Sequence, residues 1–491
     1  MSIIDFTQYQ PPGVYIEQLA VPLVGVTGIA PDIVGIVGPS QGYRTVTESY
    51  VLNAETPTTL NQYGANPASV SVTNQSGVPY LLTDYIVTVI EGPTVSQNQV
   101  QLMMATPSNI NPGSAVYVTY QYTDQNYFLP VTYTDYTSVK SDWGAPLDLS
   151  TNQILSPLSL AAQLAFTNGA NTILICPTQD TGGVASRSGL ADAYQNLAAV
   201  EALDIIVPLP VGITGTPALP GDVINIGLDL ATFLNSQAQV GIFGVGLVGY
   251  DAANQVAPDV IANGISNYRI QEHWPNQMNY FNGSNNASFI ISGYYLAAAW
   301  AGVLASLQRQ IPLTKKNVSG LSGIPNSVFT TMSVAYKNQL SSSGVAVTEQ
   351  VTGGGLQMRH SVTTQTTAVT TRELSIIRAG DGMIEMIQNT LENSGLIGSA
   401  FTPNTVATVK SLVQGALEAL VAQNTIVGYV NLGVQQQNTN PLVVLVQFQY
   451  QPAYPLNYIV VQYAIDVTTG SVSTVTTAPD PTGGSTGNTG T

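Results

Sequence analysis

Three glycines, Gly244, Gly246 and Gly249, follow an apolar segment with the spacing GxGxxG. In a dinucleotide-binding protein such glycines let a pyrophosphate approach the first turn of a helix. Here the residues after Gly249 are polar and continue to Pro258 without a helical pattern. We therefore interpret the three glycines as part of a strand and the turn that follows it. A dinucleotide-binding α/β enzyme is the weaker alternative.

Glu272 and His273 are the best candidates for general acid–base chemistry, because the chain has only 2 histidines and the other is His360. Adjacent side chains on a strand point to opposite faces, so we expect these two to diverge. The single cysteine, Cys176, lies in an apolar segment and is expected to be buried. We find no set of metal ligands and no phosphate loop with its lysine, and we expect neither catalysis nor a cofactor.

Charge is scarce, since charged residues make up 8% of the 491 residues, against roughly 25% in typical domains. The net charge of −16 argues against nucleic-acid binding, which depends on Lys and Arg contacts to phosphates. Neutral polar surfaces favour association between proteins, although some enzymes are also poor in lysine. The N-terminus lacks signal-peptide features and the apolar segment 294–307 is too short to span a bilayer, so we expect cytosolic folding and no membrane insertion.

The order of helix and strand patterns predicts a multidomain α/β and α+β protein. An N-terminal arm covers residues 1–22 and a flexible tail covers 468–491. Between them we expect an α/β domain with a mostly parallel sheet (23–60 and 150–360), an inserted all-β, sandwich or barrel-like domain (61–149) and a C-terminal α+β domain (361–467).

Two strand patterns occupy residues 441–467, joined by Pro452 and Pro455. In both strands apolar residues alternate with polar ones, so the apolar residues share one face. In the first strand they are Val444, Val446, Phe448 and Tyr450, and in the second they are Ile459, Val461, Tyr463, Ile465 and Val467. Two strands alone are marginally stable in water. The arm offers one strand without a neighbour, whose central residues are Gly13, Val14, Tyr15, Ile16 and Glu17. We therefore expect strands from other copies to complete this C-terminal sheet, which would generate rings or helices.

Four stretches of the sequence resemble phage contractile tail sheath proteins. They are the arm PPGVYIEQL (11–19) with the following IVGIVGPSQGY (33–43), the helix around Gly302 and Val303, the segment 370–429 with Arg372, Arg378, Phe401 and Asn404, and the closing strand–proline–strand segment. The family's usual Arg and Asp are absent from the helix, and residues 61–150 are not covered. Their order along the chain makes the resemblance more specific than any single motif.

The resemblance implies a structural subunit that polymerises around an inner tail tube and contracts to drive the tube through the host envelope. It implies partners as well: other copies in hexameric rings or a helical polymer, the tail tube protein, and baseplate and tail terminator proteins. The expected location is the virion, after assembly in the host cytoplasm. A face of the C-terminal domain would contact the tube, with Arg378 and Lys410 as candidates. A type VI secretion-like or other phage-derived injection sheath is the alternative, and a surface-layer or adhesive protein is disfavoured by the missing export signal.

Overall fold

The structure is a computed structural model, and it describes residues 32–40, 42–94, 97–123, 127–179, 185–200, 203–212, 222–251, 256–283, 285–351, 355–402, 404–459, 464–465 and 472–473. The chain divides into two compact units, Met1–Ala453 and Tyr454–Thr491. In the second unit β20 (Ala464–Ile465) and β21 (Val472–Ser473) form an antiparallel pair. All other elements belong to the first unit.

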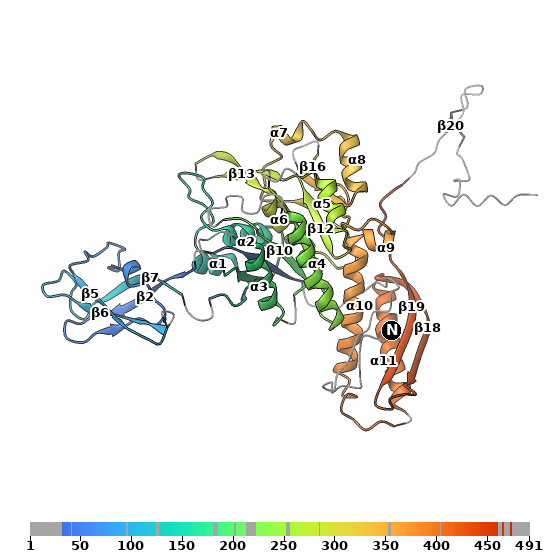
Figure 1. The fold of residues 1–491 in the computed structure, drawn as a ribbon, viewed down its shortest axis with the longest axis horizontal. Helices are drawn as coiled ribbons and strands as arrows, with labels where there is room; N and C mark the ends of the chain where they lie inside the picture. Colours follow the sequence, from blue (N-terminus) through green and yellow to red (C-terminus); the bar gives the residue numbers. More distant parts are fainter. Residues whose placement is uncertain are drawn as a thin grey trace, which may run out of the picture. The chain divides into compact units, whose positions relative to one another are not determined.

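A nine-stranded sheet forms the centre of the first unit (Figure 1). Its order is β15 (Asn317–Val318), β17 (Leu356–Met358), β16 (Val345–Gln350), β12 (Ile270–Trp274), β11 (Val245–Val248), β10 (Ile205–Pro208), β1 (Ile33–Gly38), β9 (Thr172–Pro177) and β8 (Val131–Tyr133). The strands from β16 to β9 run parallel, and antiparallel strands close both ends. Parallel strands carry continuous apolar sequences because both faces are covered. The predicted mostly parallel sheet is confirmed.

Helices cover both faces of this sheet. On one face lie α2 (Pro157–Thr167) and α6 (Gly293–Ser306), and on the other lie α3 (Arg187–Leu197), α4 (Val223–Gln239) and α5 (Pro258–Ile265). Every residue of α6 except Ser306 is buried, as expected for a helix that is apolar all round. The residues before α6, Ala287–Ser292, form β14, which pairs with β13 (Gln277–Asn282).

Residues 44–122 form two three-stranded antiparallel sheets around a separate buried cluster. One sheet contains β2 (Arg44–Val51), β7 (Ala115–Tyr122) and β4 (Ser71–Thr73), and the other contains β3 (Thr58–Thr59), β6 (Gln99–Met104) and β5 (Tyr85–Ile90), with the 3₁₀ helix η1 (Pro67–Ser69) before β4. The inserted β domain was predicted over residues 61–149, whereas the paired strands span residues 44–122. β2 pairs with β7 along its whole length, whereas β8 and α1 (Tyr136–Trp143) pack at the end of the nine-stranded sheet.

The C-terminal part of the first unit is built on two long helices, α10 (Leu374–Glu392) and α11 (Thr405–Ala422). They cover one face of a sheet made by β18 (Ile426–Gln436) and β19 (Val444–Pro452) (Figure 1). Three short helices precede them, and they are α7 (Asn326–Phe329), α8 (Val334–Ser342) and α9 (Val369–Arg372). Mixed α/β architecture with several sheets is thus the overall class.

Candidate assembly site

The β18–β19 sheet has two edges, and among the described residues no third strand pairs with either of them. The two strands are antiparallel, with Tyr429 opposite Tyr450 and Val434 opposite Val446. The register shifts twice along β18, and Asn431 has a φ of 57° within the second shift. Such bulges increase the local twist and interrupt pairing. Free edges of this kind can accept a further strand through main-chain hydrogen bonds.

The two faces of β19 differ in the way that its alternating sequence predicts. Val444, Val446, Phe448 and Tyr450 pack against a buried cluster on α10 and α11 formed by Met383, Ile387, Val409, Val413, Ala416, Leu417 and Leu420. Gln447, Gln449 and Gln451 lie on the other face and are exposed. Ile426 is the only residue of the two strands that is fully buried. The apolar face is therefore only half covered by its own chain.

The predicted pairing of this sheet is wrong. The sequence suggests that 444–451 pairs with the strand beginning near Ile459, but β19 pairs with β18 instead. Sequence reasoning missed β18 because Gly428, Gly433 and the two bulges break the alternation of its apolar residues. Asn424 lies in the turn between α11 and β18 with a φ of 57°. An asparagine just after a helical pattern can indicate a helix end, and this was the sequence signal for a strand starting near Ile426.

The remaining strand-exchange candidates lie outside this sheet. Gly13, Val14, Tyr15, Ile16 and Glu17 are outside the described residues, as are Val461, Tyr463 and Val467. Within the separate C-terminal unit Ile459 is exposed, and Ile465 belongs to β20 and lies opposite Val472. Their part in exchange between copies stays a prediction.

Helix α10 joins the C-terminal sheet to the main body. Leu374 and Ile377, in its first half, belong to the hydrophobic core of the nine-stranded sheet. Met383 and Ile387, in its second half, belong to the cluster beneath β18 and β19. One continuous helix with a face in each core positions the small sheet relative to the large one.

Buried ion pairs reinforce this joint. Arg309, which follows α6, donates to Asp32 (2.9 Å), to Glu385 of α10 (2.9 Å) and to Asp204. Arg378 of α10 donates to the other carboxylate oxygen of Asp32 at 2.5 Å and to the carbonyl of Leu304 at 2.9 Å. Burial raises the pKa of Glu385 to about 7, against the opposing influence of Arg309. Burial and Asp32 raise the pKa of Asp204 to about 6.

A second buried pair lies on the same helix. Arg269 holds Asp381 through two hydrogen bonds of 2.6 and 2.9 Å, and its side chain is 1% exposed. Paired, hydrogen-bonded charges of this kind are strongly destabilising to break, because one charge is then left buried without its partner. The geometry thus makes α10 a stiff connection.

The two candidates for tube contact are placed differently. Arg378 is buried and 3% exposed, with its guanidinium on Asp32, so it cannot meet another protein in this conformation and that prediction is corrected. The sequence around an arginine does not show whether its side chain is exposed or is buried against a distant carboxylate. Here the carboxylate is that of Asp32, 346 residues away in the chain. Lys410 lies exposed on α11 and remains available.

The candidates for chemistry are packing residues. A Cβ on Gly246 would lie 2.5 Å from Leu230, and one on Gly249 would lie 2.2 Å from the carbonyl oxygen of Gly293. These glycines therefore permit close approach of strand and helices. Cys176 is buried as expected, and burial raises its thiol pKa to about 12.

Glu272 and His273 are both fully buried on β12. Burial raises the pKa of Glu272 well above its usual value and lowers that of His273 to about 3. Neither side chain has a hydrogen-bond partner among the described residues. Burial therefore favours the uncharged form of both groups and keeps them from contact with any substrate.

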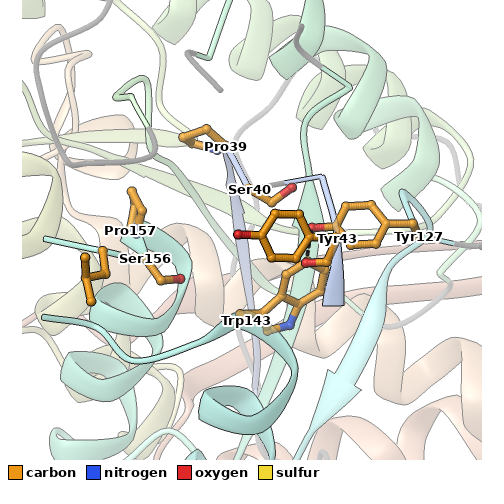
Figure 2. Close-up of a pocket in the computed structure, with 8 residues that line it drawn as sticks. Pro39, Ser40, Tyr43, Tyr127, Trp143, Ser156 and Pro157 are labelled. Atoms are coloured by element: carbon orange, nitrogen blue, oxygen red, sulfur yellow. Dashed lines mark hydrogen bonds between the residues drawn. The ribbon is translucent and has the colours of Figure 1, made fainter. Parts of the chain in front are cut away.

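The carboxyl end of β1 is the place where a doubly wound sheet usually binds a ligand. Figure 2 shows that Tyr43, Tyr127 and Trp143 gather there beside Ser156 and Pro157 of the α2 start. The Tyr127 and Trp143 rings meet edge to face at 5.5 Å, and the remaining cavity measures about 10 Å³. That is room for at most one water molecule.

Among the described residues, α11 is the one helix that is long and apolar enough to cross a membrane. Its mean hydropathy is 1.2, and 28% of it is buried. Val413, Leu417 and Leu420 pack into the cluster beneath the β18–β19 sheet. This packing is typical of an amphipathic helix on a sheet, with one side left toward solvent or a partner.

Comparison with known proteins bears on this arrangement. No protein-family model matches the chain. The tail sheath protein of Mycobacterium phage Bxz1 is 28% identical over 586 aligned positions, which cover 96% of this chain and 98% of the relative. The chain is a homologue of phage tail sheath proteins. The tail sheath protein of Bacillus phage SP01 is also 28% identical, over 40% of this chain and 33% of its own length.

Solved structures of sheath proteins share the fold. The contracted helical sheath of the anti-feeding prophage has a TM-score of 0.52, with 12% identity, and covers 94% of this chain and 100% of its own. The contracted sheath complex of an extracellular contractile injection system, PVC, has a TM-score of 0.50 and 12% identity. The match covers 94% of this chain and 99% of that sheath chain. At such identities the likeness concerns the fold. The resemblance to sheath proteins found in the sequence is confirmed.

Proposed function

We propose that this chain is the structural subunit of a contractile phage tail sheath, which polymerises around the tail tube and contracts to drive it through the host envelope. Likeness to the Mycobacterium phage tail sheath protein along nearly the whole chain carries this proposal. The half-covered β18–β19 sheet supports it, because a polymer needs a surface that a single copy leaves incomplete. The subunit would be a virion component assembled in the host cytoplasm, without enzymatic activity or cofactor.

Strand exchange is the proposed link between copies. The arm strand Gly13–Glu17 of one copy would add to one edge of the β18–β19 sheet of another, with Tyr15 and neighbouring apolar residues extending the face of Val446, Phe448 and Tyr450. The strand that contains Ile459 to Ile465 would add to the second edge of a further copy. Donor and acceptor are different surfaces, so repeated exchange gives rings, hexameric in our proposal, or a helix.

The stiff joint supports a role in contraction. Because α10 carries charges buried in the main body and apolar residues buried under the sheet, the two parts of a copy would rotate together. Contraction would then be a change between two packings of rigid subunits, while the exchanged strands keep the copies linked. No nucleotide is needed for such a switch.

The proposed contact with the tail tube is the exposed side of α11 around Lys410. Baseplate and tail terminator proteins would bind the two ends of the polymer. We further propose that the two sheets of residues 44–122 form a domain inserted into the sheath fold, since they have their own buried cluster.

Deletion of residues 1–20 tests the proposal. We expect the truncated protein to melt like the full-length chain but to form no tubes in negative-stain electron microscopy, because the sheet loses one donor strand. Deletion of residues 480–491, which carry no strand pattern, is the matched control and should leave assembly unchanged. Long tubes formed by the arm deletion would contradict the exchange.

A sheath of a phage-derived injection system is the second candidate, favoured by the likeness to the anti-feeding prophage sheath. That likeness is limited to the fold, whereas the sequence likeness is to phage tail proteins. Mass spectrometry of purified virions separates the two candidates: the chain should be present in particles that package a genome.

A further inference from the structure

Three cations bind a single carboxylate near one end of the nine-stranded sheet, and a fourth cation is the sequence neighbour of one of them. The carboxylate of Glu349, on β16, forms salt bridges with Arg359 (N–O distance 2.9 Å), Lys337 (3.0 Å) and Lys315 (3.3 Å). Lys316 follows Lys315 in the chain. We call Lys315, Lys316, Lys337 and Arg359 the basic edge. One carboxylate cannot neutralise them, so the basic edge keeps an excess of positive charge in a chain whose net charge is −16.

The basic edge is held in place by the sheet. The backbone N–H of Lys315 donates to Met358 of β17 at 2.8 Å, and Arg359 directly follows that strand. Burial alone would raise the pKa of Glu349, but Lys337, Lys315 and Arg359 lower it, so the carboxylate stays charged. Lys315 is the most accessible member, with 63% of its side chain exposed.

The opposite end of the same sheet carries three carboxylates beside two cations, Lys140 and Arg44, whose guanidinium lies 5.2 Å from the Trp143 ring. There β8 is the last strand, and the helix α1 that follows it begins at its cap Asp135 and carries Asp142. Asp148 lies a few residues beyond the helix, and Lys140 is the only cation between Asp135 and Asp148. Among the described residues, Asp135 and Asp148 accept hydrogen bonds from nearby serine and threonine groups, and neither forms an ion pair. We call Asp135, Asp142 and Asp148 the acidic edge.

We infer that the basic edge of one copy docks against the acidic edge of the next copy in the assembled polymer. The inference rests on the proposed function, because it concerns a second contact between sheath subunits. The two edges lie at opposite ends of one rigid sheet, so a copy cannot satisfy its own charges. Head-to-tail contact between copies satisfies both edges and continues from copy to copy.

The occupant is a second copy rather than a nucleic acid. Only the basic edge carries clustered positive charge among the described residues, and the rest of the chain would repel phosphates. A protein surface with clustered carboxylates is the chemical complement, and this chain presents one on the far side of the same sheet. The contact should weaken with salt, because most of these groups are exposed or half exposed.

Charge reversal tests the inference on the full-length chain. Lys315→Glu with Lys316→Glu makes both ends acidic, and Asp135→Lys with Asp148→Lys makes both ends basic. We expect each variant alone to need at least a tenfold higher concentration to form tubes, as measured by sedimentation and negative-stain microscopy. An equimolar mixture should assemble near the wild-type concentration, because the two variants can alternate.

Lys140→Glu is the matched control, since it makes the same lysine-to-glutamate change at one residue beside the acidic edge and should not weaken assembly. Thermal melting of each variant checks the fold, and rescue by mixing excludes a folding defect. Unchanged assembly of the Lys315/Lys316 variant would overturn the inference, and so would failure of the mixture when both variants melt like the wild type. Wild-type protein that forms no tubes would instead overturn the proposed function, and the inference with it.

Discussion

The nine-stranded sheet and the β18–β19 sheet differ in how completely one chain covers them. Strands β1, β9 and β10 are almost wholly buried between two layers of helices. In β18 and β19 only Ile426 is buried, and helices cover one face. Burial of a large apolar side chain stabilises by about 1.5–3 kcal/mol. The first sheet obtains that stabilisation within the chain, whereas the second leaves part of it for a partner.

The joint between the two sheets should give the largest effect. Arg378→Met removes one partner of buried Asp32 and should cost about 3–5 kcal/mol of unfolding free energy, measured by denaturant unfolding. Arg187→Met breaks the exposed pair with Asp229 and is the matched control, with an expected cost of about 0–1 kcal/mol. Similar costs for both variants would show that the joint is not buried and stiff.

Two helical glycines should respond in opposite directions. A Cβ on Gly302 would lie 2.2 Å from the carbonyl oxygen of Ala165, so Gly302→Ala should force α6 and α2 apart and cost about 1–3 kcal/mol. Gly415, in α11, has no atom within 4 Å of such a Cβ, and Gly415→Ala should stabilise by about 0.5–1 kcal/mol. Thermal melting measures both, and a shared sign would contradict the contrast in packing.

Glu272 should make the main body depend on pH. Its folded pKa is raised by burial, so stability is highest below the unfolded pKa of about 4.5 and falls as pH rises toward the folded pKa. Glu272→Gln keeps the shape without the ionisation, so the melting temperature of this variant relative to the wild type should increase between pH 5 and pH 8. A difference that is constant with pH would contradict the buried, uncharged state.

The large sheet could be predicted from the sequence because its signals are local. Each parallel strand is a short apolar segment followed by a helical segment, as in NTILICP before the helix Arg187–Leu197, and the order of segments implies the architecture. The alternation of Val444, Val446, Phe448 and Tyr450 likewise indicated the inner face of β19.

The pairing and the joint could not be predicted because they depend on distant residues. β18 carries two glycines and two bulges, which hide its alternation, so β19 was assigned the wrong partner. Arg378 looked like a surface cation, but the carboxylate that it binds is Asp32, at the other end of the chain. Nothing in the residues around Arg378 specifies that pairing.

Hydrogen exchange tests the central claim that β18 and β19 are completed by other copies. The measurement compares the arm-deleted monomer with the assembled full-length protein, peptide by peptide. We expect peptides of 426–452 to exchange rapidly in the monomer and to gain strong protection in the polymer, while β1 and β9 are protected in both. Equal protection of β18 and β19 in the two states would contradict the account.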